Sequence, residues 1–135
     1  MLPANVLLQK MGPDKMEFST IGYLASHTKR AKGAQERLTR RYAMVDLEKN
    51  PEAEVDVILA LGGDGFMLHT LHAFMERGVP IYGMNCGSVG FLMNPYGEED
   101  LPDYLSRATP VTLRPLRMIA TDTKGKHHKA LAINE

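Results

Sequence analysis

One short glycine-rich turn constrains the fold of this chain more than any other feature. The sequence Gly-Gly-Asp-Gly at residues 62–65 follows an unbroken apolar run at 57–61 and precedes a helix-like stretch at 66–77. A strand, a glycine-dense turn and a helix start form a ligand-binding edge in open α/β sheets. The glycines allow a sharp turn and close ligand approach, and the helix start offers unpaired N–H groups to anions. We therefore expect an α/β fold with a site at this turn.

The turn differs from an ordinary phosphate cradle because it contains a carboxylate. Asp64 repels phosphate, but it suits a sugar hydroxyl, which it can bind or deprotonate. An aspartate at this position can also act only as a helix N-cap, a role that Asp fills readily. The residues alone leave both roles open.

Size and composition indicate one modest domain with a real core. The chain has 135 residues, of which 44% are hydrophobic, so wholesale disorder is not expected. Its 16 basic and 16 acidic residues balance, which gives no global attraction to nucleic acid or to a membrane surface. The one cysteine, Cys86, excludes an internal disulfide and fits a reducing compartment. We therefore expect a cytoplasmic protein with no nucleic-acid or membrane partner.

Charge is uneven along the chain. The segment 27–42 is basic and the segment 46–56 is acidic. Nucleic-acid binding would need aromatic residues or a known module beside the basic run, and neither is present. The basic run is predicted to be the solvated face of a helix.

The order of expected elements indicates a doubly wound parallel sheet. Residues 1–17 read as a loose leader, and Thr28 is a plausible N-cap for the first helix. The run at 55–61 lacks alternation, which is typical of a strand buried on both faces of a parallel sheet. The expected strands are 21–25, 43–45, 55–61 and 79–84, and the expected helices are 29–41, 65–77 and 98–107. This order defines an α/β lobe over residues 18–108.

The pattern changes at Thr109. Residues 111–123 and 126–133 are strand-like, and a Lys-Gly turn at 124–125 separates them, which predicts a β-hairpin. One hairpin cannot bury its own apolar face. We therefore expect residues 109–135 to be the first piece of a β-rich second domain that this chain contains only in part.

Three segments together resemble the N-terminal portion of bacterial, ATP-dependent NAD kinases. They are the Leu-Gly-Gly-Asp-Gly motif at 61–65, the second glycine loop at 83–92, and the Ala-Ile-Asn-Glu sequence at 132–135. Diacylglycerol and sphingosine kinases and 6-phosphofructokinases share the first motif in looser form, so the combination is the specific signal. The resemblance covers residues 18–135. Phe66 is a departure, because many members have Thr or Asn there.

The resemblance implies transfer of the γ-phosphoryl group of ATP to the 2′-hydroxyl of the adenosine ribose of NAD, with a divalent metal ion such as Mg²⁺ on ATP. Asp64 would be the catalytic carboxylate, and no residue of this chain is assigned to the metal. The full-length protein is expected to be a homo-oligomer. The family's C-terminal domain, with its Gly-Ser-Thr-Ala-Tyr segment, is absent from this chain, which by itself is therefore expected to be weakly active or inactive. The alternatives are a lipid kinase of the diacylglycerol type and a non-catalytic dinucleotide-binding module.

The resemblance also implies a set of binding residues. They are Asp64, Gly65, Leu68, His69, Phe91, Leu92, Asn134 and Glu135. Phe91 and Leu92 would form the wall for a base ring, and the last pair would hydrogen-bond the ribose and adenine of NAD. From the residues alone, Leu68 could equally be a core residue and His69 a surface residue. Whether the donor is ATP or polyphosphate, and whether NADH is accepted, stays open.

Overall fold

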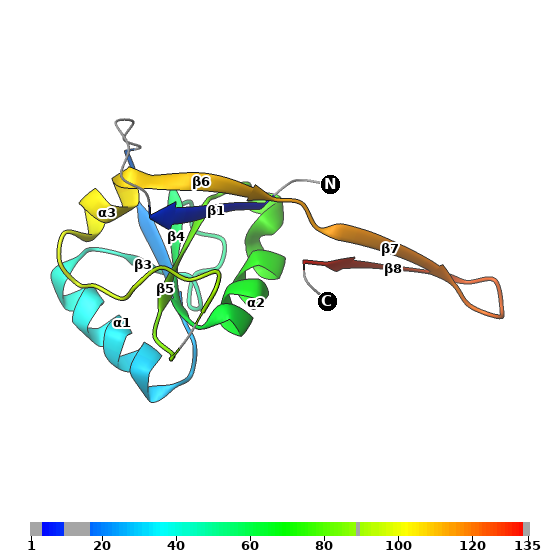
Figure 1. Ribbon diagram of the computed structural model, residues 1–135, viewed down its shortest axis with the longest axis horizontal. Helices are drawn as coiled ribbons and strands as arrows, with labels where there is room; N and C mark the ends of the chain where they lie inside the picture. The colour runs from blue at the N-terminus through cyan, green and yellow to red at the C-terminus, as the bar shows by residue number, and fades with distance from the viewer. Residues whose placement is uncertain (1–3, 10–16, 89, 134–135) are drawn as a thin grey trace.

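The computed structural model describes residues 4–9, 17–88 and 90–133. Within them, one large sheet has six strands in the order β3-β2-β4-β5-β1-β6, and a separate hairpin joins β7 and β8 (Figure 1). The strands of the large sheet are β1 (Ala4–Gln9), β2 (Ile21–Ala25), β3 (Val45–Asp46), β4 (Val57–Gly62), β5 (Ile81–Asn85) and β6 (Ala108–Leu113). Neighbouring strands of this sheet are parallel, except that β6 pairs antiparallel with β1. The expected α/β fold is confirmed.

Helices cover both faces of the sheet, as a doubly wound arrangement requires (Figure 1). On one face lie α1 (Lys29–Arg41) and α3 (Leu101–Arg107), which bury Leu38 and Leu105. On the other lies α2 (Asp64–Phe74), continued by η1 (Met75–Arg77), which buries Leu71. Every residue of β4 between them is buried, as its unbroken apolar sequence predicted. No helix in the described part of the chain is both long and apolar enough to cross a membrane.

The first helix begins where the sequence predicted. The side chain of Thr28 accepts a hydrogen bond from the backbone N–H of Ala31 at 3.2 Å, so Thr28 is the N-cap. The small residues Ala31 and Ala34 face the sheet and are fully buried. The start of α1 lies at the carboxyl edge of the sheet because α1 follows the end of β2 after three residues.

Strand β1 corrects the expectation of a loose leader over residues 1–17. Residues Ala4–Gln9 pair parallel with β5 and antiparallel with β6. Val6 and Leu7 are buried, with 2% and 0% of their surface exposed. The expectation was wrong for this segment because its apolar run is short and its strand partners lie far along the chain, so no local signal predicts the pairing.

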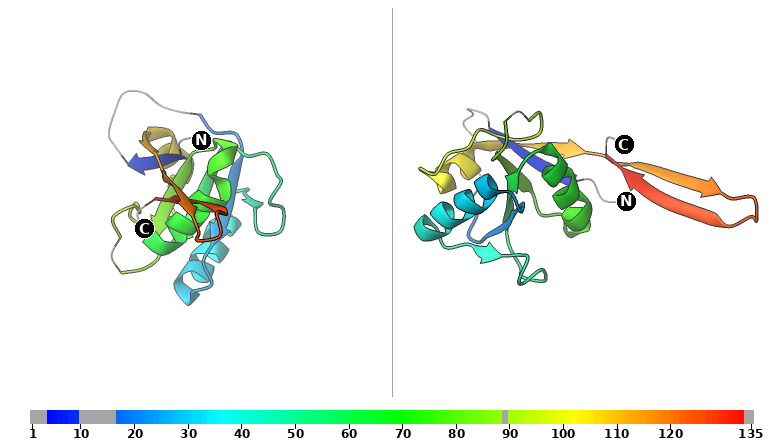
Figure 2. Two further views of the ribbon diagram at one scale, coloured as in Figure 1. Left: turned by 90° about the vertical axis from the view of Figure 1, so that its right-hand side faces the viewer. Right: turned by 90° about the horizontal axis from the view of Figure 1, so that it is seen from below.

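Strand β6 changes the expected division at Thr109. Residues Ala108–Leu113 extend the large sheet by pairing with β1. The hairpin is formed by β7 (Leu116–Thr121) and β8 (His127–Ala132) and projects away from the body of the molecule (Figure 2). Pro115 follows β6 and precedes β7; it has no backbone N–H to donate, so the strand expected over 111–123 is interrupted there. That the hairpin begins a second domain stays a prediction.

The buried side chain of Asn94 ties the second glycine loop to the sheet. Its amide nitrogen donates to the backbone oxygens of Leu7 at 3.0 Å and Gly83 at 2.9 Å. Its backbone N–H donates to Gly83, and its carbonyl accepts from Asn85, both at 2.8 Å. Asn94 is 4% exposed, so these bonds are shielded from water. One side chain therefore joins β1, β5 and the segment that leaves the loop.

We predict that Asn94→Ala lowers the free energy of unfolding by about 2–3 kcal/mol, because two buried carbonyl oxygens each lose a donor. Urea denaturation followed by circular dichroism measures the change. The matched control is Asn50→Ala, since Asn50 is exposed, and its effect should stay within about 0.5 kcal/mol. Equal effects at the two positions would show that the Asn94 side chain does not brace the sheet.

Candidate functional site

The glycine-rich turn lies where the direction of the sheet reverses. From β2 the chain passes through α1 to β3 on one side, and the next strand, β4, pairs with the opposite edge of β2. The helices that follow β2 and β4 cover opposite faces of the sheet. In open α/β sheets, ligands bind at the carboxyl ends of strands at such a switch point. The turn at 62–65 therefore occupies the expected ligand-binding edge.

The turn is tight because helix α2 begins directly over it. A Cβ atom added to Gly62 would lie 2.8 Å from the Cβ of Phe66, so this position has room only for glycine. Gly63 is the N-cap of α2 and Asp64 is its first residue. The helix start therefore receives no side-chain cap, and the cap role considered for Asp64 is wrong.

The carboxylate of Asp64 binds the second glycine loop instead. Its Oδ2 accepts a hydrogen bond from the backbone N–H of Phe91 at 2.8 Å, and its Oδ1 accepts one from Leu92 at 3.0 Å. A negative charge in the first turn of a helix is favourable, because the unpaired N–H groups there carry partial positive charge. Asp64 is thus held by both its helix and the neighbouring loop.

Further backbone bonds join the two loops at the carboxyl edge. The N–H of Cys86 donates to the carbonyl of Gly62 at 2.8 Å, which continues the pairing of β4 with β5. Just beyond, the side-chain oxygen of Asn85 accepts from the N–H of Gly87 at 2.9 Å. The first and second glycine loops therefore form one continuous surface.

The structure brings four of the predicted binding residues together. Phe91 follows Gly90 with its side chain 92% exposed, so it does not pack between loop and sheet. Leu68 and Leu92 are half-buried and pack against the cluster under α2. Leu68 is one helical turn after Asp64 and so lies on the same side of α2. Asp64, Leu68, Phe91 and Leu92 line one edge of the site.

The other predicted residues lie elsewhere or outside the described chain. Gly65 is exposed, with open space where a side chain would be. His69 is exposed beside the ring of Phe66 and lines a separate pocket of about 220 Å³ with His27. The structure thus does not place His69 next to Phe91. Asn134 and Glu135 fall outside the described residues.

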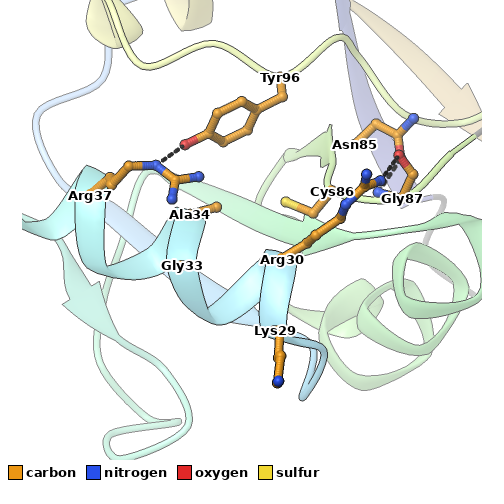
Figure 3. A pocket seen from close by; sticks show the side chains of 9 residues that line it. All are labelled: Lys29, Arg30, Gly33, Ala34, Arg37, Asn85, Cys86, Gly87 and Tyr96. Carbon is orange, nitrogen blue, oxygen red and sulfur yellow. Dashed lines mark hydrogen bonds between the residues drawn. The ribbon is translucent and has the colours of Figure 1, made fainter.

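A basic pocket lies beside the two loops, between the start of α1 and the end of β5 (Figure 3). Its volume is about 360 Å³. Arg30 reaches the carbonyl of Gly87 at 3.5 Å, and Arg37 donates to the hydroxyl of Tyr96 at 3.2 Å. The pocket is lined by Lys29, Arg30, Gly33, Ala34, Arg37, Asn85, Cys86, Gly87 and Tyr96.

Sequence reasoning missed this pocket. It predicted the basic run as a solvated helix face, yet three of the cations line a cavity with the second glycine loop. The available signal was the spacing of Arg30, Ala34 and Arg37, which puts a small residue between two cations on one side of the helix. That spacing predicts a pocket only when the position of the loop after β5 is also known.

The thiol of Cys86 lies at the wall of the basic pocket. Burial raises the pKa of the Cys86 thiol, and the neighbouring cation of Arg37 offsets this only in part. The thiol is therefore protonated at neutral pH, and a thiol is a far weaker nucleophile than a thiolate. Cys86 is therefore poorly suited to act as a nucleophile.

Within the described ranges, no group of three or more His, Cys, Asp or Glu side chains is placed to hold a metal ion. The adjacent residues His127 and His128 bond to different partners on the hairpin, Thr121 at 2.9 Å and Asp122 at 3.0 Å. Their rings therefore do not converge.

Comparison with known proteins assigns the family. A family model described as the ATP-NAD kinase N-terminal domain matches residues 7–108. The chain belongs to the NAD kinase family. It is 47% identical over 119 residues to the NAD kinase of Rhizobium meliloti (strain 1021), a match that covers 88% of this chain and 44% of that protein.

Other relatives give the same picture. The chain is 49% identical over 115 residues to the NAD kinase of Xylella fastidiosa (strain 9a5c), covering 85% of this chain and 42% of that protein. For the NAD kinase of Caulobacter vibrioides the identity is 46% over 115 residues, with the same two coverages of 85% and 42%. The chain therefore spans less than half the length of these curated relatives.

We predict that the pH midpoint for alkylation of Cys86 lies above that of an unfolded cysteine. A raised pKa keeps the thiol neutral to higher pH, so the rate with iodoacetamide should rise later than in urea-unfolded chain. Arg37→Gln should move the midpoint further up, because it removes the cation that lowers the pKa. Measuring the midpoint rather than the rate separates titration from access. A native midpoint equal to the unfolded one would contradict the buried environment of the thiol.

Proposed function

We propose that this chain supplies the N-terminal part of an ATP-dependent NAD kinase, which transfers the γ-phosphoryl group of ATP to the 2′-hydroxyl of the adenosine ribose of NAD. The observation that carries the proposal is the position of one carboxylate, Asp64, at the switch point of the sheet, where the backbone N–H groups of Phe91 and Leu92 hold both of its oxygens. Family membership supports the same reaction.

The carboxylate has the chemistry to receive the attacking hydroxyl. An ionised carboxylate offers about four lone-pair sites, and the N–H groups of Phe91 and Leu92 use two of them. A ribose hydroxyl can donate to a remaining site on Asp64, which orients its oxygen for attack and receives its proton as the new P–O bond forms. At the same time the bond from the γ-phosphorus to the leaving oxygen of ADP breaks.

Two groups of residues near the glycine loops suit the two substrates. The exposed ring of Phe91 can stack on the adenine of NAD, and the half-buried Leu68 and Leu92 can supply apolar contacts. The phosphates of ATP are anionic, and Lys29 and Arg30 supply cations in the pocket beside the loop. We propose that Gly65 gives a backbone contact to the dinucleotide and that Asn134 and Glu135 complete its binding.

Magnesium would arrive as part of the substrate, bound to the phosphate oxygens of ATP, where it would neutralise charge that develops during transfer. The described residues offer no cluster of their own for it. A cytoplasmic homo-oligomer is part of the proposal. The single half-buried thiol of Cys86 fits a reducing compartment, and the open edges of β7 and β8 offer a surface for association.

We predict that Asp64→Asn abolishes the reaction. The test uses a chimaera in which this chain replaces the equivalent N-terminal part of the Rhizobium meliloti relative. NADP formation from NAD and ATP should fall by at least about 10³-fold, because the amide can neither accept the proton nor hold both loop N–H groups.

The matched control is Asp100→Asn, which removes one negative charge at the start of α3, away from the loops, and should keep the parent rate. A parent chimaera that phosphorylates diacylglycerol but not NAD would favour the lipid-kinase alternative. One that binds NAD without phosphorylating it would favour the non-catalytic module. Near-parent turnover in Asp64→Asn would remove Asp64 from the reaction.

A further inference from the structure

We propose that the backbone N–H groups of Phe91 and Leu92 are positioning groups that fix the carboxylate of Asp64 in the orientation in which it receives the hydroxyl. This inference rests on the proposed function. The structure supplies the geometry: one N–H reaches each carboxylate oxygen, at 2.8 Å and 3.0 Å. A carboxylate held at both oxygens cannot rotate without breaking both bonds. Each oxygen keeps a lone pair for another donor.

The donors are themselves held firmly. Before them, the loop is fixed by the bond from Cys86 to Gly62 and by the side chain of Asn85 on Gly87. After them, the buried Asn94 bonds to β1 and β5. The segment that carries Phe91 and Leu92 is therefore braced on both sides. Positioning by preorganised donors needs this kind of support, because a loose donor would follow the carboxylate rather than direct it.

Gly90 shows how closely the loop packs on the carboxylate. A Cβ atom at this position would lie 2.8 Å from Oδ1 of Asp64 and 3.3 Å from Cγ of Met93. The requirement at this position is therefore space for the carboxylate.

Phe91 combines two contacts that can be separated by mutation. Its ring is 92% exposed and available to a base, whereas its N–H is bound to Asp64. A change of side chain removes the ring and leaves the N–H in place. A change to proline removes both.

The first experiment compares Gly90→Ala with Gly97→Ala in the chimaera. The added methyl at 90 presses on Oδ1 of Asp64, and we expect kcat for NAD phosphorylation to fall roughly 10- to 100-fold with an unchanged KM for ATP. Nothing lies within 4 Å of a Cβ at Gly97, so this control should keep the parent values. Parent kcat in Gly90→Ala would overturn the inference.

The second experiment compares Phe91→Ala with Phe91→Pro. The alanine variant should raise KM for NAD and change kcat by less than about threefold, because the N–H that positions Asp64 stays. The proline variant should show the same rise in KM and a further fall in kcat of about tenfold or more. Equal kcat values in the two variants would show that the N–H does not position the carboxylate.

A third measurement uses the 135-residue chain and does not depend on catalysis. In ¹⁵N-labelled chain, Asp64→Asn should shift the amide signals of Phe91 and Leu92 and speed their hydrogen exchange, whereas Asp100→Asn should leave both unchanged. Unchanged amides in Asp64→Asn would overturn the inference even in an active enzyme. A parent chimaera inactive toward NAD would instead be the failure of the proposed function, and with it of the catalytic part of this inference.

Discussion

Two hydrogen bonds from the backbone of Phe91 and Leu92 to the carboxylate of Asp64 join the loops that follow β4 and β5. The candidate ligand-binding edge of the sheet depends on this link, since it is what fixes the carboxylate of the first loop against the braced second loop. The strands beneath are central and buried, and the bond from Cys86 to Gly62 extends their pairing into the loops. The site is thus an extension of the rigid centre of the sheet.

The support for this edge comes from distant parts of the chain. The side chain of Asn94 bonds the segment after the second loop to β5 and to β1. Strand β1 is formed by residues near the start of the chain. On the other side, Thr28 caps α1 and so places Lys29 and Arg30 beside the loop. The neutral chain in this way holds opposite charges at one edge of the sheet: the carboxylate of Asp64 and the cations of Lys29 and Arg30.

Local sequence signals predicted most of the fold. The apolar run of β4, the Thr28 cap and the range of the first helix all depend on neighbours along the chain, and all were confirmed. Strands β1 and β6 were not predicted in their places, because they are formed by pairing with each other across nearly the whole chain. The sequence of a short apolar segment does not indicate which distant strand it will pair with.

The sequence also predicted the candidate site only in part. Asp64, Phe91 and Leu92 were identified from their motifs and lie together, but what links them is backbone N–H groups, which no residue pattern reveals. The basic pocket was missed because a helix with cations on one side is usually solvated, and only the loop after β5 turns it into a cavity. His69 was grouped with the site by resemblance, and the structure places it on another pocket.

The central claim is that the two glycine loops of this chain form one surface for the dinucleotide. The most direct test is an NMR titration of the ¹⁵N-labelled 135-residue chain with NAD at millimolar concentration. The account predicts that shifts concentrate at the amides of Asp64, Gly65, Phe91 and Leu92, while those of β3 and of the hairpin turn stay in place. Shifts confined to the pocket around His27 and His69, or spread evenly over the chain, would contradict it.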